Sequence, residues 1–172
     1  MKKLIVILIF FIFQSNFAIP DTNIVFVDLD KIVKISKPGA SILNQLNKKN
    51  EKILKSFLNE EKNLKKKEKK YVSQKNIISN EEFQSNINKL KLEINEYNNK
   101  RMKTINDFKK LKIRSTNNFL QMINPILTEY SDKKSISLIL QKKNLIIGKT
   151  ELDITDEIIK IINIEIKEFE IE

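Results

Sequence analysis

One long stretch decides how this chain folds. Residues 39–78 have the sequence GASILNQLNKKNEKILKSFLNEEKNLKKKEKKYVSQKNII. Residues 40–124 contain neither glycine nor proline, so nothing in them obliges a helix to stop. At about 1.5 Å per residue, residues 39–78 would form a helix on the order of 60 Å long. Such a helix is far longer than a compact domain of this size requires.

Large and apolar residues recur here with the alternating spacing of three and four that is typical of a coiled coil. The first series is Leu43, Leu46, Asn50, Ile53, Phe57, Glu60, Leu64, Lys67, Tyr71, Gln74 and Ile78. The second is Phe83, Ile87, Leu90, Ile94, Tyr97, Arg101, Thr104, Phe108 and Leu111. Between them, Ser79 and Glu82 have the spacing of a capping box that starts a new helix. The pattern therefore predicts a helical hairpin over residues 39–130 with its tip near residues 73–80.

The distal half of this hairpin is predicted to be weakly packed and flexible. Glu60, Lys67 and Gln74 occupy seam positions that a coiled coil normally fills with apolar side chains. The densest charge run lies in the same region. Either it is a solvated helix face, or it attracts acidic partners. The candidate residues for electrostatic contact with a partner are Lys65, Lys66, Lys67, Lys69, Lys70 and Tyr71.

The composition argues against several classes of function. The chain has 172 residues, a net charge of +10 and neither cysteine nor histidine, which excludes metal sites and nucleophile pairs that need either residue. It also has no glycine-rich phosphate loop. We therefore predict no enzyme, no catalytic residues, no metal and no cofactor. Only Arg101 and Arg114 of the 32 basic residues are arginine, which argues against specific nucleic-acid recognition.

The N-terminus has the layout of a secretory signal peptide. Lys2 and Lys3 precede an apolar run at residues 4–13, which is too short to span a bilayer. We predict a signal peptide at residues 1–18 with cleavage after Ala18; an uncleaved membrane anchor is the alternative. No cysteine follows, so a lipoprotein anchor is excluded. A cleaved signal predicts export, which in a Gram-negative cell means the periplasm.

The segments on either side of the hairpin are predicted to form a body at its base. Residues 19–38 hold a strand (23–28) and a short helix (29–35), which Asp28 and Asp30 cap. Pro125 either kinks the returning helix or restarts it. Residues 131–163 contain two strand-like runs, 136–140 and 145–147, which we interpret as a β-hairpin, and then a final helix capped by Thr155. The acidic extension at residues 164–172 is compatible with a helix, a strand or a loose tail.

This predicted body is too small to stand alone. Three short strands and a small helix bury little core and leave sheet edges uncovered, so we predict a homo-oligomer. The fold class is α+β, with a long antiparallel helical hairpin on a small β-rich oligomerisation body. The residues expected to form the oligomerisation body are Ile24, Val25, Phe26, Val27, Leu138, Ile139, Leu140 and Ile146.

Two segments carry a resemblance to a known family. The chain resembles the Skp (OmpH-like) periplasmic chaperones in the type of its segments and in the order in which they follow one another. The segments are NIVFVDLDKIVKISKPGASILNQL (residues 23–46) and MINPILTEYSDKKSISLILQKKNLIIG (residues 122–148), followed by DITDEIIKIIN (residues 153–163). The resemblance implies a homotrimer whose three hairpins enclose a cavity. It also implies ATP-independent holding of unfolded outer-membrane β-barrel proteins until they reach the insertion machinery.

The resemblance also implies an association with lipopolysaccharide or an anionic membrane surface. The candidate contacts are Lys109, Lys110, Lys112 and Arg114. Two other functions are alternatives. A polyanion or nucleic-acid binder would find its partners in the cytoplasm, which the signal peptide opposes. A structural spacer of the envelope would need an apolar or paired distal seam.

Overall fold

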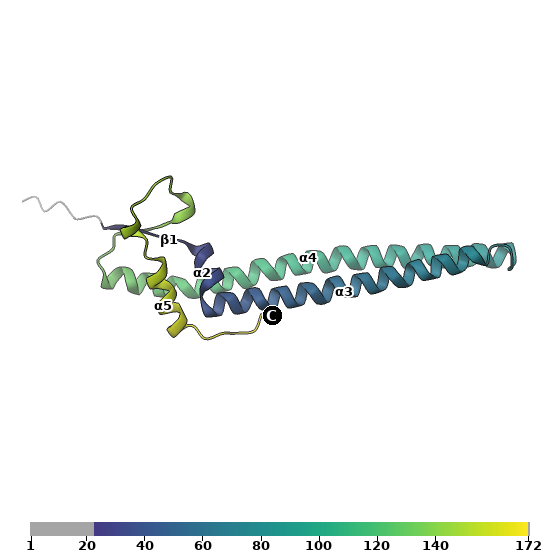
Figure 1. Ribbon diagram of the computed structural model, residues 1–172, viewed down its shortest axis with the longest axis horizontal. Coiled ribbons are helices and arrows are strands. Elements are labelled where there is room, and N and C mark those ends of the chain that lie inside the picture. Colours follow the sequence, from purple (N-terminus) through teal and green to yellow (C-terminus); the bar gives the residue numbers. More distant parts are fainter. Residues whose placement is uncertain (1–22, 172) are drawn as a thin grey trace, which may run out of the picture.

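A long rod of two antiparallel helices projects from a small body in the computed structural model (Figure 1). The structure describes residues 23–171, so the predicted signal peptide and its cleavage site lie outside the described residues. Helix α3, Lys37–Ser73, runs outward, and helix α4, Asn80–Lys133, returns. Residues 74–79 join them at the tip. The predicted fold class, α+β with a long antiparallel helical hairpin on a small body that contains strands, is confirmed; within the described residues the sheet of the body has two strands.

The two long helices begin where their capping residues stand. Ser36 is the N-cap of α3, and its hydroxyl accepts a hydrogen bond from the N–H of Gly39. A Cβ at Gly39 would lie 2.3 Å from the carbonyl oxygen of Val33, so only glycine allows this close approach. Ser79 is the N-cap of α4 and accepts from the N–H of Glu82 at 3.2 Å, which confirms the predicted cap.

Helix α4 continues through Pro125 without ending. The predicted restart at this proline is therefore wrong, while the kink stays a prediction. Proline removes only one backbone donor, and the helix on both sides is fixed by packing. Phe119, Ile123 and Ile126 of α4 are all buried against the body, and this burial outweighs the lost hydrogen bond.

The sheet of the described residues is a parallel pair. Strand β1, Ile24–Val27, pairs with β2, Leu138–Gln141, so that Val25 lies opposite Ile139. Parallel neighbours need a long crossover connection, and the whole hairpin of α3 and α4 provides it. Phe26 also forms a single bridge with Asp153 on the other side of β1, which places β1 between the two segments.

The β-hairpin predicted from residues 136–140 and 145–147 is wrong. After β2 the chain turns into a short 3-10 helix, η1, Lys142–Asn144, and residues 145–147 form no strand. The backbone of β2 is already paired with β1, and the chain then turns toward the Phe26 ring, which lies 2.8 Å from the place a Cβ of Gly148 would take. Ile146 and Ile147 are left fully exposed.

The hydrophobic core lies where the hairpin meets the body. It joins helix α2, Leu29–Ile35, the base of α3 and α4, and helix α5, Thr155–Glu165. The most deeply buried apolar side chains are Ile32, Ile42, Phe119, Ile123, Ile158 and Ile162. Because all four helices contribute, the direction of the arm is fixed to the body at its base.

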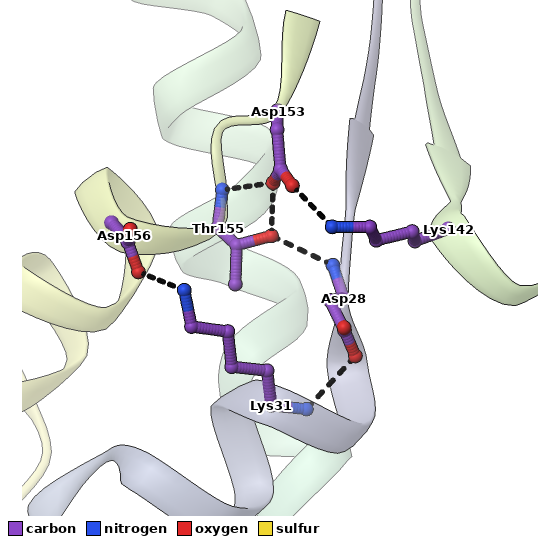
Figure 2. Close-up of polar contacts among 6 residues, drawn as sticks. All are labelled: Asp28, Lys31, Lys142, Asp153, Thr155 and Asp156. Atoms are coloured by element: carbon purple, nitrogen blue, oxygen red, sulfur yellow. Dashed lines mark hydrogen bonds and ion pairs between the residues drawn. The ribbon is translucent and has the colours of Figure 1, made fainter. Parts of the chain in front are cut away.

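A polar network ties the first strand to the last helix (Figure 2). The hydroxyl of Thr155 accepts a hydrogen bond from the N–H of Asp28 at 2.9 Å and donates to the carboxylate of Asp153. Asp153 also pairs with Lys142 at 2.7 Å. Of the two residues predicted to cap α2, Asp28 does so, since its Oδ1 accepts from the N–H of Lys31, whereas Asp30 lies within the first turn of the helix. The network closes the body around β1.

The expectation that Thr155 caps α5 is wrong. Thr155 is the first residue of the helix, after a 3-10 turn, η2, Thr150–Leu152. The carboxylate of Asp153 accepts from the backbone N–H of Thr155 instead, at 3.0 Å. Because the Thr155 hydroxyl is turned inward toward Asp28, it is not available to the helix terminus.

The predicted acidic extension is helical at residues 164 and 165, which end α5, and then folds back along the arm. Beyond α5, residues 166–171, here called the C-terminal strap, run in extended form beside the base of α3 (Figure 1). Ile166 is buried, and Phe169 and Ile171 pack against the core. Of the three conformations left open by the sequence, the strap has neither a helix nor a paired strand, yet it is held against the body.

Candidate functional site

An aromatic cluster joins the two helices at the middle of the arm. The rings of Phe57 and Tyr97 meet edge to face, with centroids 6.2 Å apart, and the Arg101 guanidinium lies 5.7 Å above the Phe57 ring. The hydroxyl of Tyr97 donates to Glu61 at 2.6 Å. Burial, more than the Glu61 hydrogen bond, raises the pKa of Tyr97. The cluster fixes the register in which α3 and α4 pair.

Two of the polar seam residues have partners across the pair. The ammonium of Lys67 contacts both carboxylate oxygens of Glu93 at 2.7 Å, and Lys100 pairs with Glu60. The Glu93 hydrogen bond raises the pKa of Lys67. These groups are largely exposed, so each pair adds little stability. The pairs therefore specify alignment more than they hold the distal arm together.

The arm exposes an unusual number of large apolar side chains. Four of them lie near the aromatic cluster, and each directly follows a seam residue: Leu54, Leu58, Met102 and Ile105. They are between 38% and 65% exposed. In an antiparallel pair, positions that follow the seam lie on one side of both helices. Phe57 contacts Arg101, and Glu60 pairs with Lys100, so the two pairs of exposed residues lie at the same height along the arm. The four residues therefore form one surface, here called the arm patch.

The distal lysines are exposed along α3. Lys67 is directed to Glu93 in the seam region, whereas Lys65, Lys66, Lys69 and Lys70 face solvent. Tyr71 is half-buried at the seam. The six candidate residues therefore do not share one environment: four lysines face solvent, Lys67 pairs with Glu93, and Tyr71 is half-buried.

Helix geometry divides the second basic cluster. At 100° per residue, Lys109 and Lys112 point to one side of α4, and Lys110 and Arg114 point to another. Arg114 and Lys49 border a groove of about 360 Å³ whose floor includes Ile53, Phe108 and Leu111. The full lining is Lys49, Ile53, Thr104, Asp107, Phe108, Leu111 and Arg114. This groove has an apolar floor and a mainly basic rim.

The body residues predicted to join subunits fall into two groups. Val25, Phe26 and Val27 are buried inside this chain, and Ile139 and Leu140 are half-buried. Three others are exposed, namely Ile24, Leu138 and Ile146. Within residues 23–171 no strand pairs with the second edge of β2. Of the exposed group, Ile24 and Leu138 lie opposite each other in the parallel pair.

Sequence reasoning missed the arm patch because it followed the seam. Leu54 and Leu58 differ by four positions and Met102 and Ile105 by three, and each residue follows a seam position. That spacing was the available signal.

In the described part of the chain, no cluster of acidic residues has the composition of a metal site. Likewise, no helix within residues 23–171 has the length and apolar character needed to cross a membrane.

These features define an α+β protein with a long, basic coiled-coil arm. Comparison with known proteins then identifies its family. The profile of the family described as outer membrane protein (OmpH-like) matches residues 23–162. The chain belongs to this OmpH-like family. A search of curated proteins gives no match.

A solved structure has the same fold. It is the crystal structure of a Caulobacter crescentus CB15 protein assigned provisionally as an OmpH-like outer membrane chaperone. The two chains are 14% identical with a TM-score of 0.81, over 88% of this chain and 89% of the other. At this identity the likeness establishes the shared architecture. The strap lies beyond the residues that the family profile matches.

Proposed function

We propose that this protein is an ATP-independent holdase chaperone of the periplasm. It binds unfolded outer-membrane β-barrel proteins between helical arms, prevents their aggregation, and releases them to the insertion machinery. The arm patch carries the proposal. Leu54, Leu58, Met102 and Ile105 expose apolar surface in the middle of a highly charged rod, and such surfaces on soluble proteins mark interaction sites.

The chemistry of the arm suits a partner that has no fixed shape. An unfolded β-barrel strand carries apolar residues at every second position and aggregates when exposed. Methionine and leucine adapt to many apolar surfaces, so the arm patch makes weak contacts that do not depend on one sequence. Lysines at the distal arm add attraction over distances of about a Debye length, on the order of 10 Å.

The holding cavity requires several arms, and the proposed assembly is a homotrimer built through the body. The edge of β2 that is unpaired within residues 23–171 and the exposed Ile24, Leu138 and Ile146 support this contact. Unpaired edges and exposed isoleucines are features that association covers. Light scattering on the protein tests the mass of the assembly. A stable monomer would exclude the enclosed cavity.

The basic groove at the base of the arm is proposed to contact lipopolysaccharide or an anionic membrane surface. Its rim carries Lys49 and Arg114 beside the apolar Phe108. A cationic rim over an apolar floor suits an amphipathic anion. Sedimentation with anionic vesicles and with neutral vesicles tests this contact; equal binding to both would exclude it.

The test of the holdase function is suppression of aggregation without ATP. An unfolded β-barrel protein is diluted from urea in the presence of the chaperone, and light scattering is followed. The variant in which Leu54, Leu58, Met102 and Ile105 are replaced by serine should lose most of the protection. The control replaces Ile35 and Ile164, which are exposed on the body, and should protect like the unmodified protein. Equal protection by both variants would refute the role of the arm patch.

A further inference from the structure

The side chain of Gln45 holds the backbone of the C-terminal strap. The amide of Gln45 donates from Nε2 to the carbonyl oxygen of Phe169 at 2.9 Å and accepts at Oε1 from the N–H of Ile171 at 3.1 Å. A carbonyl and the N–H two residues later point to the same side of an extended chain. The Gln45 amide thus makes the contacts that an adjacent strand would make. It recognises an extended backbone and no particular side chain.

The strap side chains alternate as they would in a strand. Phe169 and Ile171 are half-buried against the core, whereas Glu168 and Glu170 are exposed. Ile166 is buried at the start of the strap, but it lies three positions before Phe169 and so stands outside this alternation. Over residues 168–171, the surface beside Gln45 therefore contacts apolar residues at every second position and leaves the residues between them in water. This is the selectivity of β-strand addition: backbone hydrogen bonds with apolar pockets at alternate residues.

We propose that the surface beside Gln45 that the strap covers is a binding site for an extended peptide that alternates apolar and acidic residues, and that the strap occupies this site in cis. The inference rests on the proposed function, because an unfolded outer-membrane strand offers the same alternation. Lys48 and Lys49 lie three and four positions beyond Gln45 on α3, and so are its neighbours on the helix surface. They favour acidic residues between the apolar ones.

The strap and an incoming segment compete for one site. Its place at the base of the arm, where α3 leaves the body (Figure 1), means that a client strand enters only after the strap leaves. The strap is attached to the chain, so its effective concentration is high. An isolated strand therefore binds weakly to the intact protein, while release of the strap exposes the site.

The experiment uses a fluorescein-labelled peptide, IEIKEFEIE, that copies residues 164–172. Fluorescence anisotropy measures its binding to the whole chain and to a released-strap variant with Phe169→Asp and Ile171→Asp. The released-strap variant should bind on the order of tenfold more tightly than the unmodified protein. Adding Gln45→Ala should weaken that binding on the order of tenfold, because two backbone hydrogen bonds are lost. Adding Asn44→Ala, at the exposed neighbouring position, should not.

A second peptide, EEIIFIKEE, has the same composition without the alternation and should not bind. Circular dichroism verifies that each variant keeps its fold. A further measurement needs no substitution: excess IEIKEFEIE should speed hydrogen exchange at the N–H of Ile171 in the unmodified protein, since that group loses its bond to Gln45.

Three results would overturn the inference: no binding by a folded released-strap variant, equal binding of both peptides, or no effect of Gln45→Ala. Each can occur while aggregation is still suppressed, and then the holdase function stands without this site. Peptide binding by a protein that never suppresses aggregation would support the binding site beside Gln45 and refute the proposed function.

Discussion

Thr155 and Asp28 are 127 positions apart in the chain, yet the hydroxyl of one accepts the backbone N–H of the other at 2.9 Å. Thr155 is 1% exposed. This bond joins the end of β1 to the start of α5 (Figure 2). The body is thus closed by contacts between residues near the two ends of the described chain, with the entire arm lying between them in sequence.

Replacing Thr155 by valine should destabilise the body. Valine keeps the shape but leaves the N–H of Asp28 without its acceptor, so the free energy of unfolding should fall by about 1–3 kcal/mol. Urea denaturation measures it. The matched control is Thr128→Val at an exposed position of α4, which should change stability by less than about 0.5 kcal/mol. Equal effects of both substitutions would contradict the role of the Thr155 hydroxyl.

Stability should fall in acid through Asp153. Burial opposes ionisation of this carboxyl, but hydrogen bonds from Lys142 and Thr155 outweigh burial and lower its pKa below 3.8. The unfolded chain then takes up the proton first as the pH falls. The contribution is present above about pH 4 and is lost as the pH falls through the folded-state pKa. Asp153→Asn should flatten this part of the pH profile of unfolding, and so should Lys142→Met.

Stability should also fall in strong alkali through Tyr130. Burial and, secondly, the hydrogen bond to Glu157 raise the pKa of this phenol to about 12. Because the unfolded chain loses the proton near pH 10, the contribution is present below that pH and is lost as the pH rises toward 12. Tyr130→Phe should flatten the alkaline profile. Ultraviolet absorbance should show the Tyr130 pKa lowered in Glu157→Gln; an unchanged value would exclude the Glu157 contact.

Adjacent residues of α3 should separate stability from binding. Phe57 is buried against Tyr97, and Leu58 is exposed. Phe57→Ala should lower the free energy of arm opening by about 3 kcal/mol, seen as faster hydrogen exchange along residues 58–100 with the body unchanged. Leu58→Ala should leave hydrogen exchange along the arm unchanged but reduce the suppression of aggregation of an unfolded β-barrel protein. If Phe57→Ala left arm exchange unaltered, the aromatic cluster would not be what holds the helices together.

Client binding should weaken as salt increases, because the exposed distal lysines act through solvent. Replacing Lys65, Lys66, Lys69 and Lys70 by glutamine should lower affinity at low salt and reduce the salt dependence. The control replaces four exposed lysines of the body and its loops, namely Lys134, Lys143, Lys149 and Lys160, with the same charge change. Titration at several salt concentrations measures both. An affinity that is constant across them would exclude electrostatic attraction.

The periodicity of the sequence predicted the hairpin because a long helix is a local structure. Residues 40–124 contain neither glycine nor proline. Ser79 caps the second helix by accepting a hydrogen bond from the N–H of Glu82, only three residues later. The arm patch could also be predicted from spacing, because each of its residues directly follows a seam position. The sequence could not predict which lysines form ion pairs. Lys67 reaches Glu93 only because the two helices pair in one register.

By itself the sequence determined the arm, since helix spacing, capping and charge act over a few residues. Only the tertiary structure decided the body. Residues 138–141 pair in parallel with β1, and not with residues 145–147 as the sequence suggested, because the long arm returns the chain to the end at which β1 begins. The strap was likewise undecided by its own alternating pattern. Its conformation depends on Gln45, a residue 124 positions before Phe169 that the fold brings beside it.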